Sequence, residues 1–204
     1  METEDQQVER IKEFWNEHGK GIIAGLVIGF AIFYGWRYYD AKVMADKEAM
    51  SEQFTEVMTA LASDNDSATL DAQAFLQANS RNTYAHLAAL ELARKAVEAG
   101  DLGTAVSALQ SVRDNAKGAL KAVADVRQAR VLNAQGQYDA ALAAIASTDA
   151  SDGFKVMVLE LRGDILLAKG DNAGARAAYQ AAIDADAQAS SLAEIKLKSI
   201  PAES

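Results

Sequence analysis

The most marked hydrophobic pattern is an uncharged stretch near the start of the chain, Gly21 to Trp36, with the sequence GIIAGLVIGFAIFYGW. At about 1.5 Å per helical residue this stretch extends roughly 24 Å, a little less than a hydrocarbon core of about 30 Å. Lys20 and Arg37 bound the stretch, and their long side chains can reach outward to the membrane surface. Aromatic residues lie at both edges, as is typical of membrane interfaces. We therefore predict a single transmembrane helix over residues 21–39.

The stretch has two other interpretations. A cleaved export signal begins with basic residues and ends in small ones. Residues 1–20 instead carry six acidic and three basic side chains, and the stretch runs on into Trp36, Arg37, Tyr38 and Tyr39. A buried core helix remains an alternative, since core helices often have apolar runs of about ten to fourteen residues.

The stretch also contains a regular glycine pattern. Gly21, Gly25 and Gly29 recur every four residues and so lie on one stripe of a helix, where a partner helix could approach closely. The alternative is that glycine is simply common in membrane helices. Basic residues near the two ends are equal in number, three on each side, so charge alone does not orient the span.

The pattern after the span is helical. Met50, Phe54, Val57 and Leu61 are spaced four, three and four residues apart, which predicts that the helix continues to about Ser63. A loop follows at residues 63–67, and then a shorter helix over 68–79 with Leu70, Ala74 and Phe75 facing inward. Residues 40–79 are therefore expected to be a helical connector with an N-terminal helix pair.

From residue 80 the pattern repeats. Gly100, Gly136 and Gly170 are separated by 36 and 34 residues, and each is expected to end one helix before the next begins. Each glycine has a small residue seven positions before it, an alanine five positions after it and a large apolar residue nine positions after it. These are Ala93, Ala129 and Gly163; Ala105, Ala141 and Ala175; and Leu109, Ile145 and Tyr179. The small residues suit the close crossing of two antiparallel helices. This layout is typical of tetratricopeptide repeats, so residues 80–186 are predicted to form a tetratricopeptide-like α-solenoid.

The match to such repeats is incomplete. The bulky aromatic residue near the start of the first helix is replaced by Ala89, Asp125 and Leu159, and the closing proline is missing. Residues 187–204 should form a capping helix and tail, with Ser191 and Glu194 as a capping pair. The expected repeat helices are 82–99, 101–115, 117–135, 137–147, 152–169 and 171–186.

Composition narrows the function. The net charge is -9, of which the part after residue 37 carries -7, so nucleic-acid binding is disfavoured. The chain has no cysteine and two histidines without a metal-binding pattern, and the phosphate-loop, dinucleotide and hydrolase motifs are missing. We therefore expect a binding protein that is not an enzyme, with no catalytic or metal-binding residues, no cofactor and no small-molecule substrate.

The expected binding surface is the inner curve of the solenoid, which the first helix of each pair lines. The candidate residues there are Leu87, Leu90, Arg94, Val97, Val126, Arg130, Asn133, Glu160 and Asp164. Arg94 and Arg130 occupy equivalent positions and could hold a carboxylate or an extended peptide backbone. The alternative is that the arginines pair with Glu91, Glu98 or Asp125 and that the apolar residues fill the core.

Several blocks of the sequence resemble a known family. An acidic tail, a span ending in GWRYY, then RNTYAHLAALELARK and LRGDILLAKGDNAGARAAYQ, make the chain similar to the YfgM family of bacterial inner-membrane proteins, ancillary subunits associated with the Sec translocon. The resemblance implies residues 1–20 in the cytoplasm and the repeats in the periplasm. It also implies association with the SecYEG translocon and with a membrane-anchored periplasmic chaperone of the peptidyl-prolyl isomerase-like type, in receiving newly exported chains. The alternative function is a structural interaction protein of another envelope complex, such as cell division or outer-membrane assembly.

Overall fold

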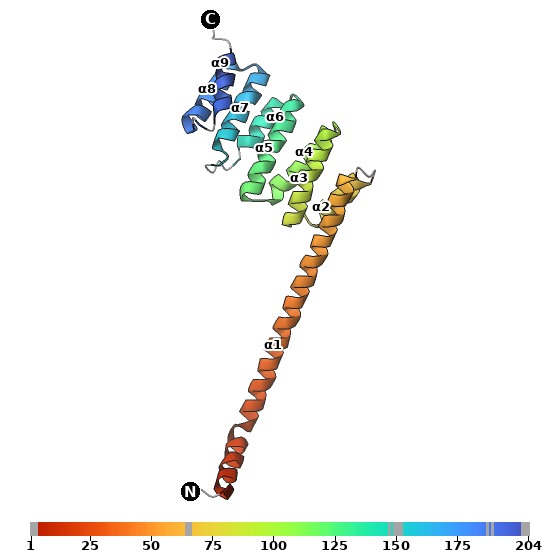
Figure 1. Ribbon diagram of the computed structural model, residues 1–204, viewed down its shortest axis with the longest axis vertical. Helices are drawn as coiled ribbons and strands as arrows, with labels where there is room; N and C mark the ends of the chain where they lie inside the picture. Colours follow the sequence, from red (N-terminus) through yellow and green to blue (C-terminus); the bar gives the residue numbers. More distant parts are fainter. Residues whose placement is uncertain are drawn as a thin grey trace. The chain divides into compact units, whose positions relative to one another are not determined.

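The computed structural model describes residues 4–63, 67–146, 148, 153–186, 188 and 190–200. Within these residues the chain forms nine α-helices joined by short turns (Figure 1). They are α1 (Glu4–Ala62), α2 (Ala68–Ala78), α3 (Thr83–Glu98), α4 (Leu102–Asn115), α5 (Gly118–Ala134), α6 (Tyr138–Ala146), α7 (Lys155–Lys169), α8 (Asn172–Ala185) and α9 (Ser191–Ser199). The all-α prediction is confirmed. The predicted limits at 147 and 152, the centre of the loop at 64–66 and the tail from 201 lie outside the described residues.

The chain divides into two compact units, Met1–Ser51 and Glu52–Ser204. Helix α1 runs without a break through the first unit and into the second. The division into a tail at 1–20, a span at 21–39 and a connector from 40 therefore stays a prediction, because no change of secondary structure marks these borders.

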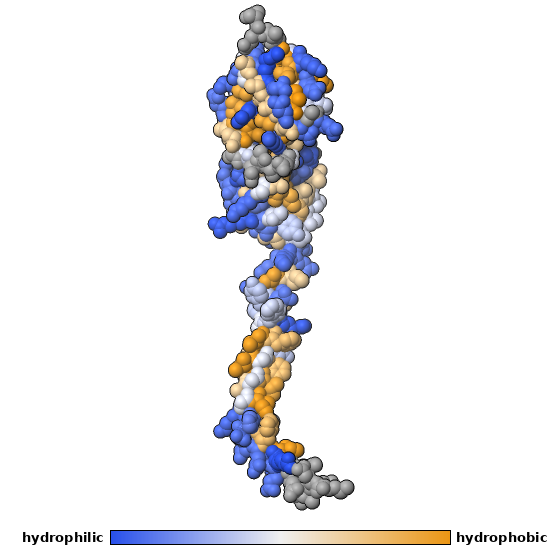
Figure 2. Space-filling model, turned by 90° about the vertical axis from the view of Figure 1, so that its left-hand side faces the viewer, coloured by the Kyte–Doolittle hydropathy of each residue, from blue (hydrophilic) through white to orange (hydrophobic). Residues whose placement is uncertain are grey.

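In the first unit, the apolar stretch of α1 is exposed. Leu26, Phe30 and Phe33 expose 56%, 58% and 61% of their surface. A helix buried in the core of a soluble domain would hide such side chains. By length and composition α1 contains one segment apolar enough to cross a membrane. Figure 2 shows this hydrophobic band along the part of α1 that precedes the repeats.

The second unit is built from helix pairs. Helix α3 packs against α4, α5 against α6, and α7 against α8, while α4, α6 and α8 each also contact the helix that follows them. The first helices of neighbouring pairs touch as well, α3 with α5 and α5 with α7. This arrangement is the solenoid that the repeat pattern predicts.

The three turn glycines end their helices as predicted. Gly100, Gly136 and Gly170 have φ of 77°, 74° and 89°, a left-handed conformation that glycine adopts without steric cost. In each turn the residue after the glycine donates its backbone N–H to the carbonyl five residues earlier, for example Asp171 to Leu166 at 2.9 Å. These are the hydrogen bonds of a Schellman motif.

The predicted contact positions form the core. The residues seven before, five after and nine after each turn glycine are all buried. Ala129, Ala141 and Ile145 belong to one apolar cluster that joins α5, α6 and α7. Tyr179 and Ala175 belong to a second cluster, which joins α8 to α9.

The ends of the solenoid are closed by helices. At one end, Phe54 of α1 packs on Tyr84 of α3, with ring centroids 5.1 Å apart, and α2 packs on α3. Of the three residues predicted to face inward, Phe75 is buried, but Leu70 is 68% exposed and Ala74 is exposed as well. Ala72, Phe75 and Leu76 form the buried face of α2, together with Ala68, and at 100° per residue this face excludes positions 70 and 74.

At the other end, α9 covers α8. The predicted capping pair of Ser191 and Glu194 is wrong, because Ser191 is already inside the helix and Ser190 is the N-cap residue. The Ser190 hydroxyl donates instead to the Asp186 carbonyl at 2.6 Å, so it cannot cap α9 in the expected way.

Candidate binding surfaces

Arg94, a predicted groove residue, is held by two acids of its own helix. Its Nε donates to Glu91 Oε2 at 3.0 Å, its Nη2 lies 2.5 Å from Glu91 Oε1, and its Nη1 pairs with Glu98. The hydrogen bond to Arg94 holds the pKa of Glu91 below its usual value, and the same bond raises the pKa of Arg94. Arg94 thus has acidic partners within its own helix, as the alternative interpretation expected, and its role in binding stays a prediction.

A pocket of about 310 Å³ brings several predicted residues together between α3 and α5. Its lining residues are Ala93, Arg94, Val97, Glu98, Leu109, Arg127, Arg130 and Val131. Arg127 lies close enough to Glu91 to help lower the pKa of that carboxyl. The pocket thus joins an apolar floor to a rim of three guanidinium groups and one carboxylate, Glu98, which pairs with Arg94. The excess of positive charge suits a partner segment with both apolar and acidic groups.

The remaining apolar candidates divide into two groups. Leu87 is 40% exposed and lies on the surface of α3. Leu90 and Val126 are buried, and Val126 belongs to the core cluster of α5, α6 and α7. Leu90 and Val126 therefore fill the interior, as the alternative interpretation expected.

The acidic candidates lie on α7. The Tyr179 hydroxyl of α8 donates to Asp164 Oδ1 at 2.7 Å, and Lys196 of α9 donates to the same oxygen at 2.5 Å. Burial, and then the bond to Asp164, raise the pKa of Tyr179. Asp164 is thus occupied in anchoring the capping helix.

Two acceptor atoms on the candidate surface lack partners. Asn133 Oδ1 and Glu160 Oε1 are buried and have no hydrogen-bond partner among the described residues. A buried acceptor without a donor is unfavourable by about 1–3 kcal/mol. A bound donor, such as a peptide N–H, would remove this penalty.

The glycine stripe of α1 faces open space. A Cβ added to Gly21, Gly25 or Gly29 would meet no atom within 4 Å. Gly25 and Gly29 form the bottom of a shallow groove of about 610 Å³, and Gly21 does not line it. The walls are Ile22, Leu26, Phe30 and Phe33. The groove has the shape that close helix packing in a membrane requires.

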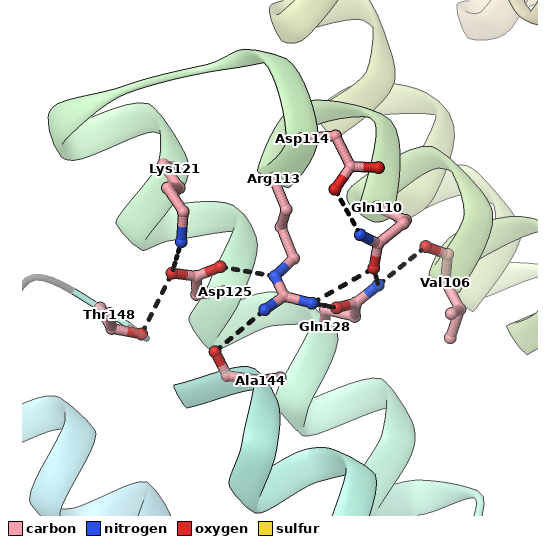
Figure 3. A network of polar contacts seen from close by, with 9 residues as sticks. All are labelled: Val106, Gln110, Arg113, Asp114, Lys121, Asp125, Gln128, Ala144 and Thr148. Carbon is pink, nitrogen blue, oxygen red and sulfur yellow. Dashed lines mark hydrogen bonds and ion pairs between the residues drawn. The ribbon is translucent and has the colours of Figure 1, made fainter. Parts of the chain in front are cut away.

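Sequence reasoning missed a buried polar network between α4, α5 and α6 (Figure 3). At its centre is Asp125, which is 0% exposed. Arg113 Nε donates to Asp125 Oδ1 at 2.5 Å, and Lys121 Nζ and Thr148 Oγ1 donate to Oδ2 at 2.7 and 3.2 Å. Arg113 also pairs with Gln128 and donates to the Ala144 carbonyl at 3.2 Å. The signal was the carboxylate at a position where these repeats carry a bulky aromatic residue.

The network is a structural connection rather than an open site. Its central carboxylate, Asp125, accepts hydrogen bonds from three side chains. Its guanidinium group, on Arg113, bonds to residues of α4, α5 and α6, including Gln110 of α4 at 3.2 Å. Among the described residues no group of three or more His, Cys, Asp or Glu side chains could hold a metal ion.

Comparison with known proteins gives the family. The tetratricopeptide repeat-like domain family matches residues 12–202. A protein of Escherichia coli (strain K12) named ancillary SecYEG translocon subunit is 36% identical over 186 residues, which cover 91% of this chain and 89% of that protein. The chain belongs to the family of ancillary SecYEG translocon subunits.

Other members of the ancillary-subunit family match along almost their whole length. The proteins of the same name from Haemophilus influenzae and Neisseria gonorrhoeae are 29% and 25% identical, each over 97% of both chains. No solved structure matches the chain. The family resemblance and the repeat fold expected from the sequence are both confirmed.

Proposed function

We propose that this protein is a non-enzymatic ancillary subunit of the SecYEG translocon, anchored by α1 in the bacterial inner membrane. The observation that carries the proposal is the full-length similarity to relatives that bear this name. The exposed apolar stretch of α1 supports the anchor, because only a membrane or another helix would shield those side chains from water.

The expected topology places the N-terminus in the cytoplasm and the repeats in the periplasm. The chain has no cysteine, so a single introduced cysteine reports its own location. A membrane-impermeant maleimide should label Ser107→Cys in intact spheroplasts and should label Glu9→Cys only after lysis. Labelling of Glu9→Cys before lysis would reverse the topology.

The inner surface of the solenoid is proposed to bind a membrane-anchored periplasmic chaperone of the peptidyl-prolyl isomerase-like type and newly exported chains. Arg94, Val97 and Arg130 gather at one pocket, and Asn133 and Glu160 each have a buried acceptor atom without a partner among the described residues. Guanidinium groups suit carboxylates of a partner, and the acceptors suit its backbone N–H groups.

Site-specific photocrosslinking tests both surfaces in one design. A crosslinker at Gly25 should capture translocon subunits, and crosslinkers at Arg94 and Arg130 should capture the chaperone or an exported chain. Gln180, an exposed residue of α8, serves as the control position on the outer side of the last pair. The proposal fails if affinity purification from gently solubilised membranes recovers neither translocon subunits nor a chaperone.

A further inference from the structure

The outer side of the solenoid carries two equivalent grooves that differ in how they are filled. We call the space between α2 and α4, over α3, the first outer groove, and the space between α4 and α6, over α5, the second outer groove. In the second groove, Arg113 of α4 reaches across to the Ala144 carbonyl of α6 and to Asp125 of α5 (Figure 3). The polar network therefore closes that groove from within.

The first outer groove has apolar residues at the positions of the three central residues of this network, Arg113, Asp125 and Gln128. The floor positions equivalent to Asp125 and Gln128 of α5, 36 residues earlier, are Ala89 and Leu92 of α3. Aligning the buried faces of α2 and α4 places Leu76 where the second groove has Arg113. Among the residues that the structure describes, no side-chain hydrogen bond is seen to cross the first groove in the way that Arg113 crosses the second.

The first outer groove is accordingly open. It has a volume of about 450 Å³, with Leu76, Leu92 and Ala108 among its lining residues. Its walls are polar but uncharged: Gln73 and Gln77 come from α2, and Thr104, Ser107 and Ser111 come from α4. No charged side chain lines the groove, although charged residues make up 24% of the chain.

We propose that the first outer groove binds an uncharged, extended segment of another polypeptide with aliphatic side chains. Amides and hydroxyls both donate and accept hydrogen bonds, as does a peptide backbone. The apolar floor would take the aliphatic side chains, and a volume of this size lies in the usual range of roughly 300–1,000 Å³ for binding pockets. A charged side chain would lose its hydration there without gaining a counter-ion, so it is disfavoured.

This proposal is independent of association with the translocon, because it rests only on the lining of the groove. It also differs from the inner surface, where guanidinium groups and unpartnered acceptors favour a partner with charged groups. The two faces of the solenoid would then select different segments.

The test uses the full-length protein in lipid nanodiscs and a fluorescent ten-residue peptide, acetylated and amidated, in which leucine alternates with serine and glycine. Ser107→Trp should fill the groove and weaken peptide binding by about tenfold or more, which corresponds to about 1.4 kcal/mol. Ala143→Trp is the matched control, because Ala143 is the equivalent exposed position on α6, beside the groove that is already filled. It should leave binding unchanged.

A second groove-filling variant and a set of charged peptides test the same proposal independently. Gln77→Trp fills the groove from the opposite wall and should repeat the loss, and helical circular dichroism confirms that each variant is folded. Peptides with lysine or glutamate in place of leucine should bind at least about tenfold more weakly. Unchanged binding to both tryptophan variants, equal binding of the charged peptides, or no binding of the neutral peptide would each overturn the proposal.

Discussion

In the last helix pair, one missing methyl group makes room for the largest fully buried side chain. A Cβ added to Gly163 of α7 would lie 2.5 Å from the Tyr179 ring of α8. The two earlier pairs have alanine at this position and a smaller partner, Leu109 or Ile145, in place of the tyrosine. The volume lost on one helix is thus recovered on the other, as close packing requires.

The pairing of volumes predicts the effect of a single methyl group. Gly163→Ala should lower the free energy of unfolding by about 1–3 kcal/mol, because the aromatic ring cannot move away inside a packed core. Chemical denaturation measures the change. In a Tyr179→Leu background, Gly163→Ala should instead raise the free energy of unfolding, because the smaller leucine leaves room for the methyl group. The double variant should therefore be more stable than the sum of the two single changes in free energy predicts. Strict additivity of the two changes would contradict the packing argument.

The central carboxylate of the polar network should be sensitive to truncation. Asp125→Ala leaves Arg113 and Lys121 without their buried acceptor, and removing one partner of a buried ion pair typically destabilises by about 3–5 kcal/mol. Asp114→Ala is the control, since Asp114 is exposed at the edge of the network and, within the described part of the chain, accepts a side-chain hydrogen bond from Gln110 alone. Its effect should stay within about 0.5 kcal/mol. Thermal or urea unfolding that shows equal losses would remove the network's structural role.

At the level of helices, the turn glycines set where each one ends. Gly100 has φ of 77°, so Gly100→Ala should destabilise by about 1–2 kcal/mol even though open space surrounds the new methyl group. Gly103 lies three residues later inside α4 and has no positive φ. Gly103→Ala should therefore be neutral or stabilising. Urea unfolding of the two variants separates backbone strain from the mere addition of a methyl group.

The contact between α7, α8 and α9 predicts a dependence on alkaline pH. The pKa of Tyr179 is raised in the folded state, by burial first and by Asp164 second, with Glu160 adding to the effect. The stability that this provides is complete below the ordinary tyrosine pKa of about 10 and is lost as the pH rises towards the folded value. The free energy of unfolding should therefore fall above about pH 10.

Tyr179→Phe should fall less steeply over the same alkaline range, although it is less stable at neutral pH because Asp164 loses a donor. Identical slopes for Tyr179→Phe and the parent protein in urea unfolding at pH 9 to 11 would show that another group titrates.

Helices were predictable because their signals are local. The glycine turns and the spacing of Val57 and Leu61 depend on residues a few positions apart, and they gave the ends of most helices to within one residue. The exposed and buried residues of the candidate binding surface were harder to predict, because burial depends on residues far apart in the sequence. Nothing local distinguishes Val126, which is buried, from Val97, which is exposed, and Arg113 meets Asp125 only once α4 and α5 have packed.

On the scale of the whole molecule, the two units differ in how far their apolar side chains are covered. In the second unit the helices cover one another's apolar faces, because each pair packs on the next from α3 to α8 and further helices pack at both ends. The apolar stretch of α1 in the first unit has no such cover. A membrane would satisfy the apolar side chains but would leave the groove over Gly25 and Gly29 to be filled by lipid or by a second helix.

Filling this groove tests which of the two units meets the translocon. Gly25→Leu with Gly29→Leu should keep the protein in the membrane, since leucine favours insertion, yet weaken its recovery with translocon subunits, because a partner helix could no longer approach the stripe. Ala24→Leu with Ala31→Leu adds two leucines on another face of the same helix and should leave recovery unchanged. Affinity purification from detergent extracts, with carbonate-resistant membrane association as the check on insertion, measures both. If the glycine variant is recovered as well as the alanine variant, the contact with the translocon lies in the repeats, and the open space above the glycines is filled by lipid.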